Sequence, residues 1–141
     1  MLQPNEQEQE KAGRKKTILV VEDSPTQAVQ IRALLVANGL HVELAADGLE
    51  GLQLANELLP GLIILDLEMP RMNGVEVVRA LKNDARTKNI PIIIFTRHDS
   101  PEALAMGLDQ GVVDFIPKDA FAKVVMVETL KQMGFIRSNR A

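Results

Sequence analysis

Residues 62–70 read Leu-Ile-Ile-Leu-Asp-Leu-Glu-Met-Pro, so four uninterrupted aliphatic residues are followed at once by an acidic side chain. The aliphatic run is too short for a helix of its own and does not alternate with polar residues, which is typical of a strand that is covered on both faces. Two other runs have the same character, residues 18–21 (Ile-Leu-Val-Val) and residues 92–95 (Ile-Ile-Ile-Phe). We therefore expect three central strands of a parallel sheet.

Two weaker segments complete the predicted sheet. Residues 41–44 (His-Val-Glu-Leu) alternate polar with apolar side chains, and residues 113–116 (Val-Asp-Phe-Ile) run into Pro117. Alternation and an adjoining proline are both typical of strands at the edge of a sheet. We expect these segments, the second and the fifth in chain order, to form the two edges.

Helix signals lie between the predicted strands. Serine followed by proline is a typical helix start, and it occurs at Ser24 and again at Ser100. The other helices are expected to open at Asp47, to open near Gly74, and to cover residues 120–133. Strand and helix thus alternate five times, which predicts an α/β fold of the flavodoxin-like (βα)5 type, a three-layer sandwich with a parallel five-stranded sheet in the order 2-1-3-4-5.

The composition indicates one globular domain and excludes several kinds of function. The chain has 141 residues, of which 46% are hydrophobic and 25% charged. It has no cysteine, which excludes disulfides, thiolate metal sites and a cysteine nucleophile. The net charge of -3 and the 3% of aromatic residues argue against a nucleic-acid partner bound through a basic surface or by base stacking.

The two ends of the chain differ from its middle. Residues 1–16 are polar and lack the apolar segment of a signal peptide, so we expect a disordered leader. No apolar run in the sequence reaches the roughly 18 residues that would span a membrane. We therefore expect a cytoplasmic protein without a membrane partner, with one domain at residues 17–133 and a short C-terminal tail at residues 134–141.

Polar side chains follow the predicted strands at the place where ligands of an open α/β sheet bind, beyond the carboxyl ends. Glu22 and Asp23 follow the first strand, and Asp66 follows the third. Thr96 and Lys118 follow the fourth and the fifth. Crowded carboxylates favour a hard divalent cation such as Mg²⁺. The central Asp66 is placed to attack phosphorus, Lys118 to neutralise charge, and Thr96 to donate a hydrogen bond to a phosphoryl group.

This set of residues resembles the receiver domain of bacterial two-component response regulators, the CheY-like family. The resemblance covers about residues 17–133 and rests on four motifs at the ends of predicted strands. These motifs are Val21-Glu22-Asp23-Ser24, Leu65-Asp66-Leu67-Glu68-Met69-Pro70 with Asn73-Gly74, Phe95-Thr96, and Phe115-Ile116-Pro117-Lys118. Their order and spacing are similar to those of the family.

By this resemblance, Asp66 is the phosphoacceptor and receives a phosphoryl group from a histidine kinase or a phosphotransfer protein. The implied Mg²⁺ ligands are three carboxylates and one backbone carbonyl, from Glu22, Asp23, Asp66 and Glu68 respectively. The protein would then be a signalling phosphoprotein that catalyses only its own phosphotransfer and dephosphorylation, and not an enzyme with a separate substrate.

The resemblance also assigns the residues that carry the signal. Lys118 would pair with the phosphoryl group, Thr96 would move toward it, and Phe115 would pack inward as Thr96 moves. The added charge of about -1.5 to -2 is large enough to shift a two-state arrangement of loops.

Three side chains near the predicted site are notable when this sequence is compared with the receiver-domain family. Asp119 follows Lys118, where the family usually has a proline, often with a cis bond. Arg97 follows Thr96, where the family commonly has a small residue, and Glu68 is an acidic residue close to the phosphoryl position. We expect Arg97 to pair with Glu68 or with the phosphoryl group and to shield the site partly from water, which would alter the lifetime of the phosphate.

We expect the signal to be passed on by binding to another protein, because only residues 134–141 follow the predicted domain. The last predicted helix contains Val124-Val125-Met126-Val127, which is apolar around a full turn, whereas burial of one face needs only a stripe. We therefore expect the face formed by the fourth helix, the fifth strand and the fifth helix to bind a downstream target protein or a second copy of the chain.

Two other functions are compatible with the sequence. A degenerate receiver could use the same fold as a protein-interaction module that does not depend on phosphorylation. A small Mg²⁺-dependent phosphohydrolase would need a second carboxylate as an acid-base group near the nucleophile, and Glu68 is the only candidate.

Overall fold

One parallel five-stranded sheet forms the centre of the computed structural model, which describes residues 17–97 and 112–137. The strands are β1 (Thr17–Val21), β2 (His41–Ala45), β3 (Leu62–Leu65), β4 (Ile92–Thr96) and β5 (Asp114–Pro117). Their order is β2-β1-β3-β4-β5, and each neighbouring pair is parallel. The predicted fold class, the strand order and the two edge strands are therefore confirmed.

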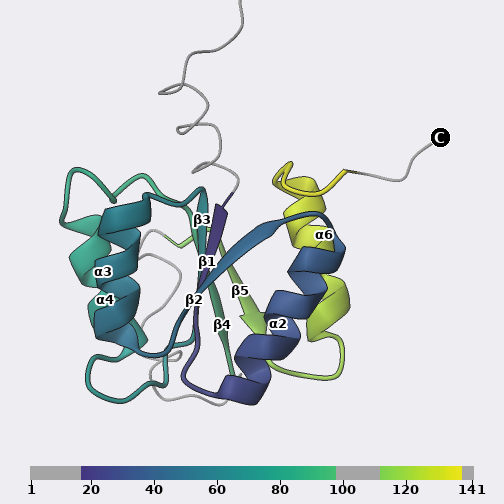
Figure 1. The fold of residues 1–141 in the computed structure, drawn as a ribbon, viewed down its shortest axis with the longest axis horizontal. Coiled ribbons are helices and arrows are strands. Elements are labelled where there is room, and N and C mark those ends of the chain that lie inside the picture. The colour runs from purple at the N-terminus through teal and green to yellow at the C-terminus, as the bar shows by residue number, and fades with distance from the viewer. Residues whose placement is uncertain (1–16, 98–111, 138–141) are drawn as a thin grey trace, which may run out of the picture.

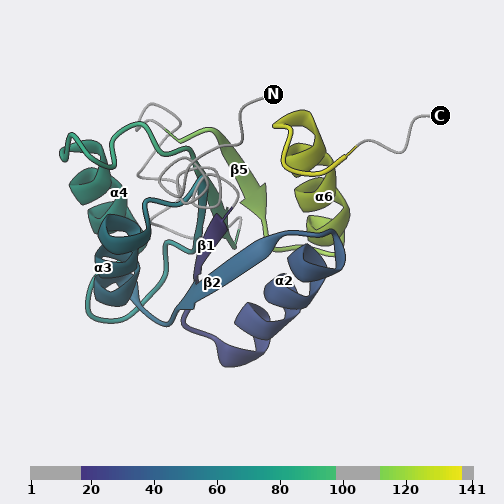
Figure 2. The same cartoon turned by 45° about the horizontal axis from the view of Figure 1, so that its top comes forward.

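Two pairs of helices cover the two faces of the sheet (Figure 1). The helices are α2 (Pro25–Ala37), α3 (Gly48–Leu58), α4 (Gly74–Lys82) and α6 (Ala122–Gln132). In both views α3 and α4 lie on one side of the strands, and α2 and α6 on the other (Figure 2). The helix expected to start at Ser100 lies outside the described residues. Among the helices of the described residues, none is long and apolar enough to cross a membrane.

Three of the predicted helix starts are made by side-chain caps. Ser24 Oγ accepts a hydrogen bond from the backbone N–H of Gln27 at 3.3 Å, and Asp47 Oδ1 accepts one from Glu50 at 2.9 Å. At the start of α4, Asn73 forms a reciprocal capping box with Glu76. Each cap satisfies an N–H group that the helix leaves without an internal partner, so these starts are fixed locally by sequence.

The last helix begins later than the sequence predicts. It was expected to start at residue 120, but α6 starts at Ala122. The reason is a turn made by Asp119, whose Oδ1 accepts a hydrogen bond from the backbone N–H of Phe121 at 2.8 Å. An aspartate side chain that bonds to the backbone two residues on offers the chain an alternative to helix. Phe121 then occupies the N-cap position without a side-chain hydrogen bond.

The core consists of two clusters of buried side chains, one on each face of the sheet. Leu19 and Val21 of β1 belong to the cluster beneath α3 and α4, whereas Ile18 and Val20 belong to the cluster beneath α2 and α6. Both faces of the central strands are thus buried, as a continuous aliphatic run requires. Ile136 also lies in the second cluster.

The connection from β3 to α4 is held close to the end of β3 by a glycine. The backbone N–H of Gly74 donates to the carbonyl of Leu67 at 2.9 Å. A Cβ atom on Gly74 would lie 2.5 Å from the backbone oxygen of Asp66 and 2.5 Å from Cα of Leu67, so a larger residue does not fit without movement of the backbone. This contact fixes the backbone at Asp66.

Candidate functional site

Asp66 lies directly after β3 with its side chain almost fully buried, at 7% exposure. Its Oδ1 accepts hydrogen bonds from the Thr96 hydroxyl at 2.8 Å and from the backbone N–H of Glu68 at 3.1 Å. Its Oδ2 accepts one from Lys118 Nζ at 2.9 Å. The structure therefore brings together the carboxylate, the hydroxyl and the ammonium that the sequence placed at the ends of three different strands.

An acidic cluster lies beside this carboxylate. Glu22, Asp23 and Asp66 each place one carboxylate oxygen within 4.8 Å of the others. Glu22 is buried and its Oε2 accepts a hydrogen bond from the backbone N–H of Ser24 at 3.2 Å, whereas Asp23 is exposed. Three hard oxygen donors at this spacing fit Mg²⁺, which binds few carboxylates and keeps several waters. The exposed Asp23 leaves one side of the cluster open to solvent.

The ammonium group of Lys118 has three acceptors. Nζ donates to Glu22 Oε1 at 2.5 Å, to Asp66 Oδ2 at 2.9 Å and to the amide oxygen of Gln27 at 2.5 Å. It also lies 5.5 Å from the centre of the Phe95 ring. All three N–H groups of the ammonium are therefore used, which fixes its position between the carboxylates. The peptide bond that links Lys118 to Asp119 is trans, as are the others of the described residues.

The pKa values of two groups at the site are raised, for different reasons. Burial raises the pKa of Glu22, against the opposing effect of its hydrogen bonds from Lys118 and from the backbone of Ser24. Burial by itself would lower the pKa of Lys118, but hydrogen bonds to Glu22 and Asp66 outweigh it and the pKa is raised. The lysine is therefore protonated at neutral pH and places a positive charge in direct contact with the carboxylate of Asp66.

A second ion pair lies at the rim of the site. Arg97 Nε donates to Glu68 Oε2 and Nη2 donates to Glu68 Oε1, both at 3.0 Å. This two-point contact is the strongest geometry that an arginine and a carboxylate can form. Of the two partners expected for Arg97, the structure shows Glu68. Because the backbone N–H of Glu68 donates to Asp66, the pair is joined directly to the phosphoacceptor candidate.

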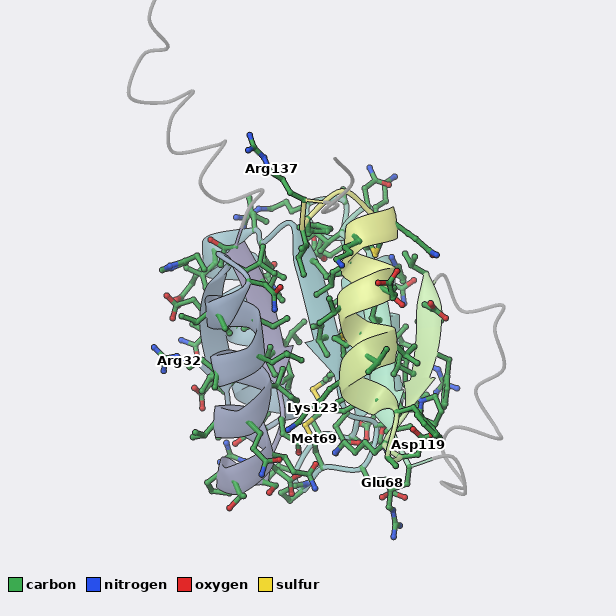
Figure 3. All side chains as sticks on the ribbon, turned by 90° about the vertical axis from the view of Figure 1, so that its right-hand side faces the viewer. Arg32, Glu68, Met69, Asp119, Lys123 and Arg137 are labelled. Carbon is green, nitrogen blue, oxygen red and sulfur yellow. The ribbon has the colours of Figure 1, made fainter. Side chains whose placement is uncertain are left out.

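The side chains around the site lie at one end of the molecule. Figure 3 shows Glu68 and Asp119 at the same end, with Arg137 at the opposite end. Phe115 lies on β5 beside Ile94, is partly buried, and packs against the cluster beneath α3 and α4. Its role as a switch stays a prediction.

Gln27 is a contact of the site that the sequence did not indicate. It lies in the first turn of α2 and was not singled out, because a glutamine on a helix is usually a solvent-exposed residue, and Gln27 is indeed exposed although it contacts Lys118. The available signal was its place three residues after the predicted N-cap Ser24, in the first turn of the helix that follows Asp23. Gln27 and Lys118 both line a cavity of about 240 Å³ between α2 and α6, whose apolar wall includes Ile31, Phe95 and Met126.

The fold and this site together define a class of protein. A parallel α/β sheet in the order 2-1-3-4-5 carries an acidic cluster, a threonine and a lysine at the carboxyl ends of its strands, as in receiver domains. The chain belongs to the response regulator receiver domain family, whose model matches residues 18–131. It is thus a receiver domain of a response regulator in two-component signalling.

Individual relatives support this assignment. The chain is similar to response regulator MprA of Mycobacterium sp. (strain KMS), with 41% identity over 101 residues, which are 72% of this chain and 43% of that protein. It therefore spans less than half the length of this relative. It is also similar to protein PilH of Pseudomonas aeruginosa (strain PAO1), with 38% identity over 101 residues, which are 72% of this chain and 84% of that protein.

A solved structure shows the same fold with a metal bound. The receiver domain of sensor histidine kinase PA1611 from Pseudomonas aeruginosa PAO1 shares 26% sequence identity with this chain. The two superpose with a TM-score of 0.75 over 83% of this chain and 95% of that chain. That receiver domain has a magnesium ion coordinated in its active site cleft.

Proposed function

We propose that Asp66 is a phosphoacceptor and that its phosphorylation, with Mg²⁺ bound, switches a protein-binding face of the domain. One observation carries the proposal. The carboxylate of Asp66 lies 2.9 Å from the ammonium of Lys118 and 2.8 Å from the hydroxyl of Thr96, in a cluster with two further carboxylates. This is the charge arrangement that phosphoryl transfer needs, because such a reaction depends on positioning and charge neutralisation.

The proposed reaction is a direct transfer from a phosphohistidine of a histidine kinase or a phosphotransfer protein. A carboxylate oxygen of Asp66 attacks phosphorus and forms a new P–O bond, while the P–N bond to the donor imidazole breaks and the imidazole nitrogen keeps the electron pair. Both oxygens of Asp66 have hydrogen-bond donors in the structure. The attacking oxygen must therefore give up a donor, which then becomes available to the phosphoryl group.

Mg²⁺ is proposed to bind the three carboxylates of the acidic cluster and, as the family resemblance implies, the backbone carbonyl of Glu68. When bound, the ion supplies positive charge that offsets the charge of the phosphoryl oxygens. The chain's own part is to hold Glu22 in place through the N–H of Ser24 at 3.2 Å and to present the exposed Asp23 to solvent.

The switch is proposed to run through Thr96 and Phe115. The hydroxyl of Thr96 already donates to Asp66 Oδ1, so a short displacement is enough for it to reach an attached phosphoryl group. Thr96 is the last residue of β4 and pairs with Pro117 of the edge strand β5, while Phe115 lies two residues earlier on that strand. A movement of Thr96 therefore acts on the edge of the sheet.

The output face is proposed to include β5 and α6. On α6 the side chains of Val124 and Val125 are 66% and 41% exposed, and Phe121 before the helix is 70% exposed. Exposed apolar side chains on one element favour a partner surface. We propose a downstream target protein, or a second copy of the chain, as the partner. Sedimentation with and without phosphorylation tests the second copy, and a monomer in both states would contradict it.

The pair of Arg97 and Glu68 is proposed to control the lifetime of the phosphate. Its two hydrogen bonds of 3.0 Å hold both side chains at the rim, next to the carboxylate of Asp66. A paired rim reduces the access of attacking water.

We further propose a cytoplasmic location and a receiver domain of residues 17–133. Residues 1–16 are proposed as a polar leader and residues 134–141 as a short C-terminal tail, whose Ile136 packs into the cluster beneath α2 and α6.

Intact mass spectrometry tests the proposed function. The protein is incubated with a small phosphodonor and Mg²⁺, beside Asp66→Asn and the control Asp114→Asn, which changes an aspartate at the start of β5. An adduct of about +80 Da in the wild type and the control, absent in Asp66→Asn, is expected for one phosphoryl group. No adduct in the wild type would contradict the proposal and would favour an interaction module. Rapid turnover of the donor without an adduct would favour a phosphohydrolase.

A further inference from the structure

We propose that Gln27 is a positioning residue that keeps the ammonium group of Lys118 at the phosphorylation site when the carboxylates around it take other partners. The inference deepens the proposed function and rests on it. It starts from the contact of 2.5 Å between Lys118 Nζ and the amide oxygen of Gln27.

Gln27 is held in place by the same residues that build the acidic cluster. Its backbone N–H donates to Ser24 Oγ at 3.3 Å, and the backbone N–H of Ser24 donates to Glu22 Oε2 at 3.2 Å. The other oxygen of Glu22 accepts a hydrogen bond from Lys118 at 2.5 Å, and the ammonium group of Lys118 also donates to the amide oxygen of Gln27. These contacts form a closed ring, so the position of the amide oxygen is coupled to the end of β1.

The three acceptors of Lys118 differ in what else they can bind. Glu22 and Asp66 are carboxylates of the acidic cluster, so a divalent cation would compete with the lysine for both, and a phosphoryl group would compete with it for Asp66. The amide of Gln27 is neutral and does not belong to that cluster. It is therefore the acceptor that Lys118 keeps throughout the reaction. A neutral acceptor also adds no charge that would repel an incoming phosphate.

The cavity between α2 and α6 shows what the lysine would meet without this contact. Gln27 and Lys118 both line it, so loss of the amide would open the ammonium to water in the cavity. Gln30 lines the same cavity one turn along α2, but no hydrogen bond joins it to Lys118 within the part of the chain that the structure describes. It is thus a matched control of the same residue type.

The test compares the full-length wild type with Gln27→Met and Gln30→Met. Methionine keeps the length of the side chain and suits a helix, but its thioether is a weak acceptor. The first readout is the lifetime of the Lys118 ammonium protons against exchange with water, followed by NMR on protein labelled with ¹⁵N at lysine Nζ, with Mg²⁺ and without. We expect a protected signal in the wild type and in Gln30→Met, and its loss in Gln27→Met with Mg²⁺ present.

The second readout is the rate of phosphorylation by a small phosphodonor at saturating Mg²⁺. Loss of one hydrogen bond of typical net strength predicts a rate about 3- to 10-fold lower in Gln27→Met, with no change in Gln30→Met. Gln27→Glu restores an acceptor and is expected to restore the protected Lys118 signal. This rescue separates positioning from a general structural role. If circular dichroism shows Gln27→Met to be unfolded, Gln27→Ala, which also removes the acceptor and suits a helix, takes its place with Gln30→Ala as its control.

Two results would overturn the inference. One is a Lys118 signal in Gln27→Met that stays as protected as in the wild type. The other is a slower reaction with an unchanged Lys118 signal, which would mean that Gln27 acts on the donor and not on the lysine. If the wild type itself accepts no phosphoryl group, the proposed function fails, while the NMR comparison with Mg²⁺ still decides the role of Gln27.

Discussion

Lys118 gives the site its electrostatic character, because one ammonium group offsets two buried carboxylates. The side chain of Lys118 is 14% exposed, and those of Glu22 and Asp66 are 2% and 7% exposed. Charges that lie so far from water are weakly screened, so removal of one partner leaves the others uncompensated. The stability of the metal-free protein should therefore depend on this lysine, and in a way that varies with pH.

Lys118→Met should lower the free energy of unfolding at pH 7.5 by about 2–4 kcal/mol in metal-free buffer. The loss should be smaller at pH 5.5. Burial raises the folded-state pKa of Glu22, and the variant lacks the lysine that opposes this rise. The folded variant therefore takes up a proton above the ordinary pKa of 4.5, where the unfolded chain does not, so its stability grows as pH falls through that raised pKa.

Urea unfolding of the wild type and the variant at the two pH values measures this effect. The difference between their midpoints should narrow toward pH 5.5. The control Lys88→Met changes an exposed lysine, and its unfolding midpoint should be close to that of the wild type at both pH values. A difference that is the same at pH 5.5 and pH 7.5 would show that Glu22 does not titrate in this range.

Arg97→Ala should shorten the half-life of the phosphorylated protein, because the variant removes the side chain that covers the rim together with Glu68. We expect a change of about 2- to 10-fold, the effect of one or two surface hydrogen bonds. The measurement is the loss of the phosphoryl adduct with time by intact mass spectrometry. Arg79→Ala, on the exposed side of α4, is the control. An unchanged half-life would remove Arg97 from the mechanism.

The sequence could predict which residues at the strand ends converge, but it did not decide every side-chain contact that they make. Parallel strands bring their carboxyl ends to one edge, so Asp66, Thr96 and Lys118 were expected to converge, and the structure places them within hydrogen-bond distance. The contact of Gln27 with Lys118 joins segments that are far apart in the chain. The choice of Arg97 for Glu68 depends equally on side-chain conformation, which no spacing rule specifies.

At the scale of the elements, the helix starts that could be predicted correctly are those that a local side-chain cap specifies. The starts of α2, α3 and α4 are fixed by side-chain caps within three residues, and the sequence showed each of them. The predicted start of α6 was wrong by two residues, because the turn at Asp119 competes with the first helical turn. A competition between two local hydrogen-bond patterns is decided by packing, and Ala122 is the first residue of the helix that lies in the core.

Gly74→Ala should disturb the site from a distance, through the loop between β3 and α4. The added methyl group would meet backbone atoms of Asp66 and Leu67 at 2.5 Å, and backbone atoms cannot turn aside as side chains can. We expect a loss of about 1–3 kcal/mol in the free energy of unfolding and a slower phosphorylation of Asp66.

Gly51→Ala is the matched control for this prediction. Its methyl group would meet the side chain of Val21 at 2.8 Å, away from the backbone of the loop. It should lower stability but leave the rate of phosphorylation per folded molecule unchanged. Equal phosphorylation rates in the two variants would show that the backbone contact at Gly74 does not position Asp66.

At the scale of the whole molecule, the site is located where the topology reverses. From β1 the chain goes to one edge of the sheet, and from β3 it goes to the other, so the ends of β1 and β3 lie side by side at the centre. The carboxylates at these two ends must share one region of low dielectric, which raises the cost of their repulsion. The fold therefore stores unfavourable energy at the site, which a bound cation would release.

Mg²⁺ should for this reason stabilise the folded protein. An ion that binds the folded state alone adds RT ln(1 + [L]/Kd), which is about 1.4 kcal/mol at ten times Kd, and a shift of about 4–8 °C in Tm is expected for a domain of this size. Thermal unfolding with increasing MgCl₂, at an ionic strength held constant with NaCl, measures the shift. Asp23→Asn removes one exposed carboxylate of the cluster and should reduce it, whereas Asp114→Asn should not. An equal shift in both variants would mean that the ion binds elsewhere and that the acidic cluster is not the magnesium site.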